Sequence, residues 1–255
     1  MTAALAALDP IGLDELTERA ALQTRVDRKY VLGTAELERL LDRLPPGTRV
    51  LQIGRDRAFR YESVYFDTPE LASYRLAAHR RRHRFKIRTR TYVESSLCWL
   101  EVKTCGPRGS TVKHRLPYRP DDRTRLDPGR AFVDAVLDGR WPAGAGFAPT
   151  LVTAYRRSTL LLPATPSRAT VDTDLTWCAT DGRRLRLAGR AVVETKCASG
   201  ASQLDRLLWT HGHRPVRISK YATGLAALYP GLPAAPWTRT LRRHFTVPPT
   251  PSRTD

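Results

Sequence analysis

Charged side chains alternate with uncharged ones through residues 84–118, the part of the chain whose residue types could do chemistry. In three runs of this stretch the charged residues occupy every second position, which we call one parity of the run: Arg84, Lys86, Arg88 and Arg90, then Glu101 and Lys103, then Lys113 and Arg115. Alternation with a period of two is typical of half-buried antiparallel strands. An ordinary solvated face mixes Thr, Ser, Glu and Lys, whereas this face is nearly all basic. The pattern therefore favours an anionic partner.

Phosphate is the anion that such a face suits best. Arg and Lys spaced two residues apart can each contact phosphate oxygens, Arg through paired hydrogen bonds. A few carboxylates share the charged parity of predicted strands: Asp27, Glu101, Asp172 and Glu194. They would repel phosphate unless a divalent cation lay between, and their oxygens suit Mg²⁺ or Mn²⁺. Phosphoryl transfer requires charge neutralisation, in-line positioning and a metal.

Composition limits the classes of protein that remain. The 255 residues include 43 Lys and Arg against 25 Asp and Glu, for a net charge of +18. This imbalance indicates nucleic acid, an anionic membrane surface or a polyphosphorylated ligand as partner. No nucleic acid is expected, because few aromatic residues interleave with the basic ones and no helix-turn-helix or zinc signature is present. No nucleophilic Ser, His and Asp arrangement or glycine-rich phosphate loop is evident either.

The four cysteines form no C-x-x-C pair, so a zinc site is not expected. No run approaches the ~20 apolar residues of a membrane span, and the first residues lack a basic segment followed by an apolar core. We therefore expect a cytoplasmic protein with reduced thiols. Any coupling to a membrane would need a separate membrane partner.

Eight strands must position these residues. The patterns place them at about residues 25–31, 57–66, 84–91, 99–103, 112–116, 151–159, 168–175 and 185–196. Helices are expected at about residues 13–20, 34–44, 67–78, 130–137, 202–212 and 219–228. We expect residues 1–230 to form a single domain and residues 231–255, rich in Pro and Arg, to form a flexible tail.

Seven of the predicted strands carry ionisable residues on one parity. Burying them in a dry sandwich would cost several kcal/mol for each uncompensated ion, and one flat sheet would leave long open edges. A closed barrel avoids both costs if the charged parity lines a wet lumen. The prediction is an α+β fold: an eight-stranded antiparallel barrel with a basic tunnel and helices packed outside.

Nine short motifs, in order, resemble those of one family. They are R-x-D-x-K-Y, Y-F-D-T-P, K-I-R-T-R, L-E-V-K-T, K-H-R, Y-R-R, V-D-T-D, V-E-T-K and S-K-Y-A-T-G, between Arg25 and Tyr229. The family is the VTC domain, the catalytic domain of the vacuolar transporter chaperone polyphosphate polymerase, within the triphosphate tunnel metalloenzyme (CYTH-like) superfamily. The resemblance implies a tunnel that binds a nucleoside triphosphate with a divalent metal and transfers its gamma-phosphoryl group to a growing polyphosphate chain.

The resemblance also implies roles for individual residues. The implied catalytic positions are Lys29, Arg88, Arg90, Lys103, Tyr155, Arg157 and Lys220. All of these except Tyr155 would contact phosphate, with Lys113, Arg115 and Lys196 as further phosphate contacts. Glu194 matches the carboxylate that holds the metal, with Glu101 as a second ligand. Glu194 has an alternative role as the partner of Lys103 or Lys196 in an internal ion pair.

One departure bears on the reaction. Triphosphatases and class IV adenylyl cyclases of the superfamily carry E-x-E-x-K on the first strand, where this chain has Arg25, Asp27 and Lys29. The loss of a carboxylate favours transfer or binding over hydrolysis. Our hypothesis is a polyphosphate polymerase, an NTP-dependent phosphotransferase whose partners are a nucleoside triphosphate and polyphosphate. A tunnel triphosphatase and a non-catalytic polyphosphate or inositol-polyphosphate receptor remain as alternatives.

Overall fold

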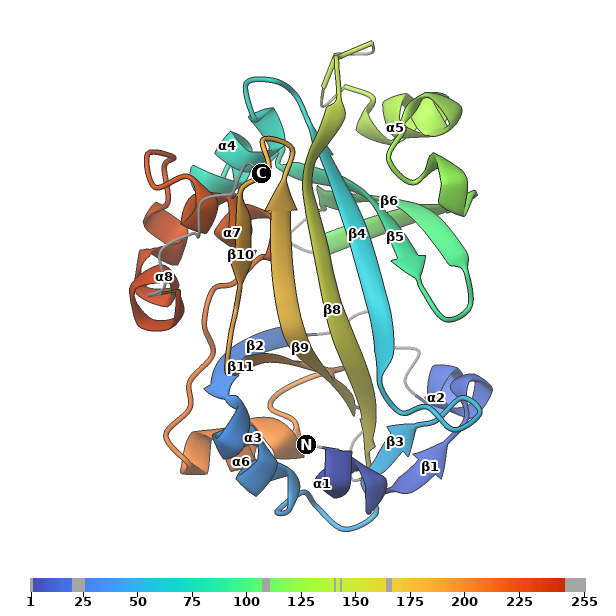
Figure 1. Ribbon diagram of the computed structural model, residues 1–255, viewed down its shortest axis with the longest axis vertical. Coiled ribbons are helices and arrows are strands. Elements are labelled where there is room, and N and C mark those ends of the chain that lie inside the picture. Colours follow the sequence, from blue (N-terminus) through green and yellow to red (C-terminus); the bar gives the residue numbers. More distant parts are fainter. Residues whose placement is uncertain are drawn as a thin grey trace, which may run out of the picture. The chain divides into compact units, whose positions relative to one another are not determined.

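The structure is a computed structural model that describes residues 2–19, 26–106, 111–139, 141–142, 144–163 and 167–245 (Figure 1). The chain divides into two compact units. Unit 1 comprises residues 1–59, 155–175 and 187–217, and unit 2 comprises residues 60–154, 176–186 and 218–255. Strands β8 (Ala148–Leu162) and β9 (Ser167–Ala179) contribute residues to both units.

Unit 1 is a sheet with helices on its apolar face. Its further strands are β1 (Asp9–Ile11), β2 (Val26–Gly33), β3 (Arg49–Leu51) and β11 (Arg190–Cys197). Its helices are α1 (Thr2–Ala6), α2 (Leu13–Arg19), α3 (Thr34–Leu41) and α6 (Gln203–Thr210). The main strand order is β2-β11-β9-β8, and β2, β11 and β9 are antiparallel neighbours. Strand β3 pairs with β8 antiparallel and with β1 parallel.

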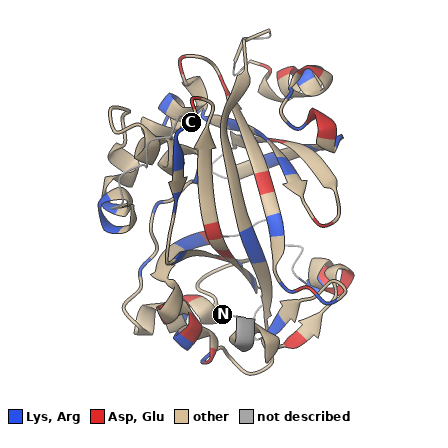
Figure 2. Ribbon diagram, viewed as in Figure 1, with Lys and Arg blue, Asp and Glu red and all other residues tan. Residues whose placement is uncertain are grey.

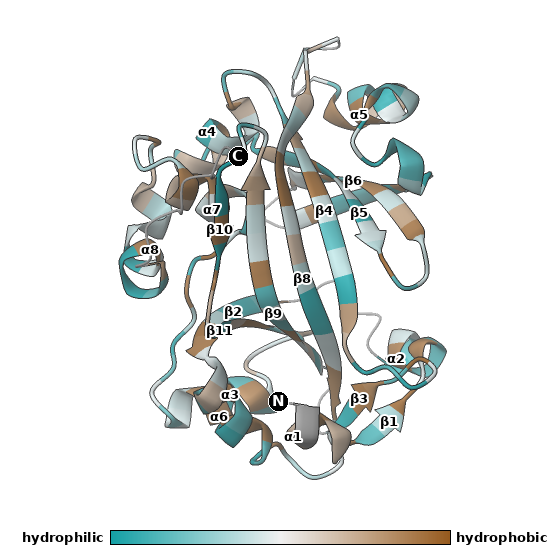
Figure 3. Ribbon diagram, in the orientation of Figure 1, coloured by the Kyte–Doolittle hydropathy of each residue, from teal (hydrophilic) through white to brown (hydrophobic). Residues whose placement is uncertain are grey.

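Strand parity decides which side chains reach the core of unit 1. Apolar residues of β2, β9 and β11 pack with the leucines of α3 and α6 in one buried cluster, which includes Tyr30, Leu32, Leu37, Leu40, Val171, Val193, Leu204 and Leu208. The leucines of α3 recur at helical spacing, which gives that helix one apolar face. Charged residues such as Asp27, Lys29, Glu194 and Lys196 have the opposite parity, whereas Arg28 shares the parity of Tyr30 and contacts Asp205 of α6. Figure 3 shows hydrophilic and hydrophobic residues interspersed along the strands.

Unit 2 contains the basic stretch of residues 84–118. Its strands are β4 (Phe59–Asp67), β5 (Phe85–Tyr92), β6 (Leu97–Cys105), β7 (Thr111–Tyr118) and β10 (Arg184–Arg186). Its helices are α4 (Ala72–Ala78), α5 (Arg130–Leu137), α7 (Lys220–Leu228) and α8 (Thr238–His244), with the short 3₁₀ helices η2 (Pro120–Asp122), η3 (Asp127–Gly129) and η4 (Ala235–Trp237). The main strand order is β8-β4-β5-β6-β7.

The core of unit 2 uses the uncharged parity of these strands. Phe85, Ile87, Leu100 and Val102 are buried together with residues of α5 such as Val133. Because side chains alternate along a strand, the charged residues of β5 and β6 must point to the other face. Packing against α5 therefore orients the basic face.

The fold class predicted from the sequence is confirmed: the protein is α+β, and its large sheet is mainly antiparallel. Among the described residues, eight strands make up the two main strand orders: β2, β4, β5, β6, β7, β8, β9 and β11. Each of them overlaps one of the eight predicted strands. Strands β1 and β3 were not predicted, because three residues are too few to display a period. Arg25, predicted in the first strand, lies outside the described residues.

The sequence prediction was wrong for two element boundaries. The helix expected from Asp67 begins at Ala72, because the Asp67 carboxylate accepts hydrogen bonds from the backbone N–H groups of Thr68, Ser73 and Tyr74. The last predicted strand is divided into β10 and β11 by a turn at Gly189, whose φ is +63°. A positive φ of this kind favours glycine.

In the segment predicted as a flexible tail, the described residues 231–245 contain η4 and α8. Trp237 is buried, and its ring lies 5.8 Å from that of Tyr74, centroid to centroid. The Phe245 ring lies 5.5 Å from that of Trp177. Apolar contacts thus hold the described part of this segment on unit 2. Among the described residues, no helix has the length and apolarity needed to cross a membrane.

Gly224 of α7 generates a test of the packing in unit 2. A Cβ atom at Gly224 would lie 2.3 Å from Cδ1 and Nε1 of Trp177. The indole cannot move away easily, since it is buried and its Nε1 donates a 2.6 Å hydrogen bond to the Lys220 carbonyl. We expect Gly224→Ala to lower the free energy of unfolding by about 1–3 kcal/mol through overpacking, although Ala favours a helix by roughly 0.5–1 kcal/mol. Urea denaturation measures this.

The control is Gly231→Ala, where a Cβ would meet nothing within 4 Å. Its stability should stay within about 0.5 kcal/mol of wild type. Equal stabilities for the two variants would contradict the described packing of α7 on Trp177.

Candidate functional site

The register of β5, β6 and β7 aligns the charged residues of unit 2 in rows across the sheet. One row is Lys86, Lys103 and Lys113, and the next is Arg88, Glu101 and Arg115. Arg90 follows in β5, opposite Trp99 of β6. Figure 2 shows Lys and Arg as blue segments among the tan residues of the sheet. These rows place one carboxylate among several cations. We call the set Lys86, Arg88, Arg90, Glu101, Lys103, Lys113 and Arg115 the unit 2 face.

Glu101 is the centre of the unit 2 face. It is 2% exposed, and its Oε2 accepts hydrogen bonds from Nε and Nη2 of Arg88 at 2.8 and 2.5 Å. Arg90 Nη1 lies 4.0 Å from the same oxygen, and Lys113 Nζ lies 3.5 Å from Oε1. Three cations thus share one buried carboxylate, and the guanidinium of Arg88 is held in one orientation.

Electrostatics keep the Glu101 carboxylate ionised. Burial alone would raise the pKa of Glu101, but the charges of Arg88, Arg90 and the neighbouring lysines hold it far below its ordinary value. For Lys103 the surroundings disfavour the charged form. Its pKa is well below that of a free lysine, because burial and the two arginines disfavour its ammonium form. The face thus carries more cations than its carboxylate neutralises, and a bound anion would favour the charged form of Lys103.

Tyrosines support the arginines from β4. The Tyr65 hydroxyl accepts a 3.2 Å hydrogen bond from Nη1 of Arg88, and the Arg88 guanidinium lies 5.8 Å from the Tyr65 ring centroid. Arg90 lies 5.8 Å from the ring centroid of Tyr61. Burial would raise the pKa of Tyr65, yet the charges of Arg88 and Arg90 lower it overall. Tyr65 therefore belongs to the charged cluster, although the sequence did not single it out.

The start of α7 joins the same cluster. The Tyr221 ring stacks on that of Tyr65 at 5.0 Å, and the Tyr221 hydroxyl donates a short hydrogen bond to buried Asp67. Ser219 caps the helix by accepting from the Ala222 N–H, and its hydroxyl accepts a 3.0 Å hydrogen bond from Lys86 Nζ. Lys220, one residue earlier than Tyr221, contributes a positive charge that lowers the pKa of Tyr65.

Unit 1 carries a second charged face, on β2, β8, β9 and β11. In the register of β2 and β11, Glu194 lies opposite Lys29, and Lys196 lies opposite Asp27. Lys196 Nζ is 2.7 Å from Oε1 of Glu194. Of the two roles that the sequence left open for Glu194, an ion pair with Lys196 is therefore present. Burial would raise the pKa of Glu194, but Lys196, Lys29 and Arg157 hold it well below its ordinary value.

Arg157 is paired with the carboxylate of Asp172. Its Nε and Nη2 donate to the two oxygens of Asp172 at 2.6 and 2.8 Å, a bidentate arrangement, and Asp172 is 1% exposed. The guanidinium lies 5.2 Å from the ring centroid of Tyr155. Burial alone would lower the pKa of Arg157, but the Asp172 charge raises it well above the ordinary value. Arg157 is thus permanently charged and oriented, and we call the set Lys29, Arg157, Glu194 and Lys196 the unit 1 face.

The two proposed metal ligands differ in how well they fit a divalent cation. Both oxygens of Glu101 are close to cations, so this residue does not fit a metal ligand. Glu194 is paired through one oxygen, and Thr170, opposite it in β9, has a buried hydroxyl with no hydrogen-bond partner among the described residues. No three His, Cys, Asp or Glu side chains in the described ranges come together as a metal site. Glu194 fits a metal only if substrate oxygens complete its coordination, as is common for Mg²⁺.

The predicted residues therefore fall into two groups. Unit 2 brings together Arg88, Arg90, Glu101, Lys103 and Lys113, with Arg115 in register and Lys220 at the start of α7. Unit 1 brings together Lys29, Tyr155, Arg157, Glu194 and Lys196. The Arg115 guanidinium lies 4.6 Å from the ring centroid of Trp99. Sequence reasoning missed Tyr65 and Asp67, although both lie in the Y-F-D-T-P motif and Tyr65 shares the parity of Tyr61.

Comparison with known proteins supplies a family. The VTC domain model matches residues 24–127 and 144–229. The comparison with curated proteins gave no match.

Solved structures with a similar fold have low sequence identity. A proposed adenylyl cyclase from Hippeastrum, described as having a dominant triphosphatase activity, is 14% identical over 78% of this chain and 94% of its own, with a TM-score of 0.49. A proposed adenylate cyclase from Vibrio parahaemolyticus is 13% identical over 80% and 98% of the two chains, with a TM-score of 0.45. A conserved hypothetical protein from Pyrococcus furiosus is 13% identical over 74% and 88%, with a TM-score of 0.40.

Removing the charge of Glu101 tests the balance of the unit 2 face. We expect Glu101→Gln to lower the free energy of unfolding by about 3–5 kcal/mol, because Arg88 and its neighbours would be buried without a counter-ion. Tripolyphosphate should restore part of this stability, since an anion that binds only the native state stabilises it. Urea denaturation with and without the anion gives both values.

The matched control is Glu94→Gln, which removes a carboxylate paired with the exposed Arg60. Its cost should be about 1 kcal/mol or less, and tripolyphosphate should not offset it. An equal cost for the two variants, or no anion effect on Glu101→Gln, would contradict the role given to Glu101.

The unit 1 face should show a pH dependence that one substitution removes. Burial, with Arg157 nearby, lowers the pKa of Lys196 to about 8 despite its pairing with Glu194. Lys196 therefore loses its charge as the pH rises through 8, and the affinity for tripolyphosphate should fall. Lys196→Arg stays protonated. Between pH 7 and pH 9 we expect the affinity of wild type to fall by about tenfold more than that of the variant. Metal-free titration calorimetry measures this.

Stability gives an independent readout of the same group. The folded pKa of Lys196 lies below the unfolded value of 10.5, so between about 8 and 10.5 the unfolded chain binds more protons. This group therefore makes the free energy of unfolding rise with pH in that window. Lys196→Arg should show a smaller rise, and identical pH profiles for variant and wild type would contradict the shifted pKa.

Proposed function

Because the chain belongs to the VTC domain family, we propose that it is a metal-dependent polyphosphate polymerase. It would transfer the gamma-phosphoryl group of a nucleoside triphosphate to the end of a polyphosphate chain. The observation that carries the proposal is the pair of basic sheet faces, on which buried carboxylates hold arginines in fixed orientations. Oriented cations are what a phosphoryl-transfer site requires, because catalysis there is mainly positioning and charge stabilisation.

The unit 2 face supplies oriented donors for phosphate oxygens. Glu101 and Tyr65 hold Arg88 while Arg90 and Lys103 lie beside it. A phosphate that approaches this face meets cations with too few counter-ions, so binding does not require an existing ion pair to be broken first. Preorganised donors of this kind stabilise the charge of a transition state without reorganisation at the moment of reaction.

The unit 1 face carries an oriented arginine and a candidate metal ligand of its own. Asp172 holds Arg157 in a bidentate pair. Lys196 can exchange its contact with Glu194 for a phosphate oxygen, which would leave the carboxylate available. A Mg²⁺ or Mn²⁺ ion held by Glu194 and the substrate's own oxygens would neutralise phosphate charge and orient the phosphoryl group.

Strand β2, which corresponds to the first predicted strand, supports transfer rather than hydrolysis. Asp27 of β2 is exposed and lies opposite Lys196 in the register. The strand therefore does not offer the two carboxylates that hydrolytic relatives carry. With fewer carboxylates, the acceptor that such a basic site favours is itself an anion, and the terminal phosphate of a polyphosphate chain has that chemistry.

Two adjacent arginines give a matched test. Arg157 lies on the charged parity of β8, whereas the exposed Arg156 lies on the opposite parity. Wild type incubated with ATP and Mn²⁺ or Mg²⁺ should produce long-chain polyphosphate on stained gels. We expect Arg157→Lys to retain the fold but lose about 10²-fold or more in rate, since a lysine keeps the charge and loses the bidentate geometry. Arg156→Lys should keep the wild-type rate.

Other outcomes would overturn the proposal. Release of monomeric phosphate without polymer would identify a triphosphatase. Tight polyphosphate binding without any turnover would identify a receptor. Glu194→Gln that leaves both metal dependence and synthesis unchanged would show that the metal is held elsewhere.

A further inference from the structure

Helix α8 presents three arginines that neither sheet face uses. Arg239, Arg242 and Arg243 are exposed, and we call them the α8 arginine face. No Asp or Glu occurs anywhere in residues 230–245. Among the described residues, no hydrogen bond or ion pair involves any of the three side chains. By contrast, Arg130 of α5 is paired with Asp134 four residues later. The α8 arginine face therefore concentrates positive charge that the fold leaves uncompensated.

The helix that carries these arginines is firmly anchored in unit 2. Trp237, Thr240 and His244 are buried at helical spacing, on the side opposite the arginines. The Tyr74 ring packs on Trp237, and the Tyr74 hydroxyl donates a 3.0 Å hydrogen bond to the Pro233 carbonyl. Trp177 packs on Phe245 just after the helix. An anchored backbone holds the arginines at fixed spacing, which lowers the entropy lost when they bind a ligand.

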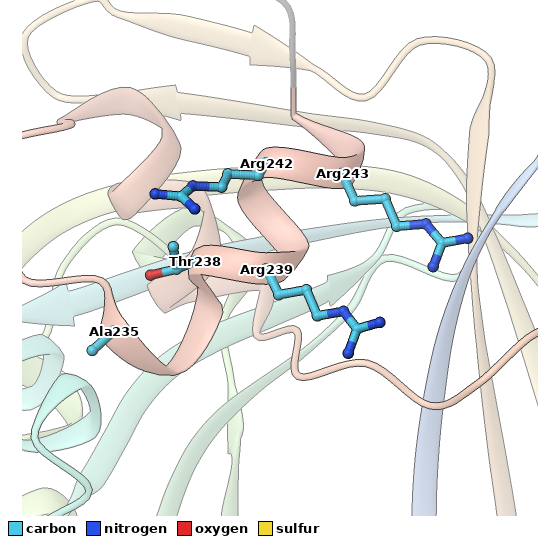
Figure 4. A pocket seen from close by; sticks show the side chains of 5 residues that line it. All are labelled: Ala235, Thr238, Arg239, Arg242 and Arg243. Atoms are coloured by element: carbon cyan, nitrogen blue, oxygen red, sulfur yellow. The ribbon is translucent and has the colours of Figure 1, made fainter.

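The arginines line a shallow open cavity of about 580 Å³, together with Ala235 and Thr238. Figure 4 shows that Arg239 and Arg243, four residues apart, extend to the same side of the helix. Arg242 extends to the other side, above Thr238. Residues three and four apart on a helix are surface neighbours. A ligand in contact with all three must therefore follow the helix surface over one turn, which suits an extended anion better than a single small one.

The surroundings decide which extended anion fits. Among the residues that the structure describes, the large exposed hydrophobic ones are Leu13, Val26, Ile53, Leu97 and Val112, and none of them belongs to α8. A helix that inserts into a membrane interface needs an exposed apolar face, which α8 lacks. Binding of single-stranded nucleic acid relies on aromatic side chains on which bases stack, and Trp237 is buried. Arg recognises phosphate oxygens through its planar fork without either feature.

We propose that the α8 arginine face binds a segment of an inorganic polyphosphate chain. The proposal rests on the proposed function for the identity of the polymer. None of the residues that line the cavity belongs to the strands of the two basic faces. The α8 arginine face is therefore a contact outside the strands of the two basic faces. An extended chain that follows the helix gains more contacts there than a short anion, and the site retains the product between rounds of elongation.

The test compares long-chain polyphosphate with tripolyphosphate. We expect the triple variant Arg239→Gln, Arg242→Gln and Arg243→Gln to bind long-chain polyphosphate about tenfold or more weakly than wild type, through the loss of charge-assisted contacts. The affinity for tripolyphosphate should be unchanged. The salt dependence of long-chain binding should become shallower, because fewer counter-ions are released. Calorimetry at several salt concentrations gives all three results.

The matched control replaces three exposed arginines of the same unit, Arg80, Arg81 and Arg82, with glutamine. It removes the same charge, so an equal loss of long-chain affinity would show general electrostatic attraction and overturn the proposal. Wild-type affinity in the α8 variant would overturn it as well. So would an α8-dependent binding of phosphatidylserine vesicles or single-stranded DNA that is tighter than that of polyphosphate.

The same variants separate this inference from the proposed function. If the α8 variant synthesises polyphosphate but binds long chains as wild type does, the inference fails and the polymerase stands. If wild type makes no polymer but binds long chains in an α8-dependent manner, the polymerase fails and the polyphosphate site stands. In a polymerase that uses the site, the α8 variant should release shorter chains than wild type at an equal initial rate.

Discussion

Cations on a buried strand face repel one another and lose hydration, and they remain stable only if a carboxylate lies among them. Both units meet this constraint in the same way. In unit 2 the carboxylate is Glu101, which contacts Arg88 through two hydrogen bonds and draws Arg90 and Lys113 towards it. In unit 1, Asp172 holds Arg157 and Glu194 holds Lys196. On the unit 2 face one carboxylate is shared by several cations, so this face is folded yet still attractive to an anion.

This balance assigns different roles to arginines and lysines. Arg88 and Arg157 each have a dedicated carboxylate and are held as oriented donors. The lysines make up the excess charge, and burial lowers the pKa of Lys103 and Lys196. Binding of a polyanion would favour their protonated forms, so affinity and proton uptake are coupled. The carboxylates that appear in the sequence as candidate metal ligands act first as counter-ions, which is why Glu101 does not fit a metal.

Aromatic side chains connect the unit 2 face to the helices of that unit. Tyr65 contacts Arg88 and stacks on Tyr221, and Tyr221 donates to Asp67, which also binds the backbone at the start of α4. The orientation of Arg88 thus depends on the packing of α4 and α7. The same helix α4 holds Trp237 through Tyr74, so the α8 arginine face rests on the same scaffold. Displacement of these helices would disturb both groups of arginines in unit 2.

The sequence by itself determined the strand parities, since a period of two in side-chain type states which residues share a face. From it came the eight strands, the α+β class, and the membership of Arg88, Lys103, Arg157 and Glu194 in charged faces. It did not determine partners, because the same parities remain when one strand is shifted by two residues against its neighbour, and only the actual register fixes which charged side chains lie opposite each other. Only the tertiary structure decided that Glu101 belongs to Arg88, that Asp172 belongs to Arg157, and that Tyr65 and Asp67 join the site. It also decided that the Pro- and Arg-rich end forms α8, because buried Trp237 finds its packing partner in Tyr74, a contact that no local pattern encodes.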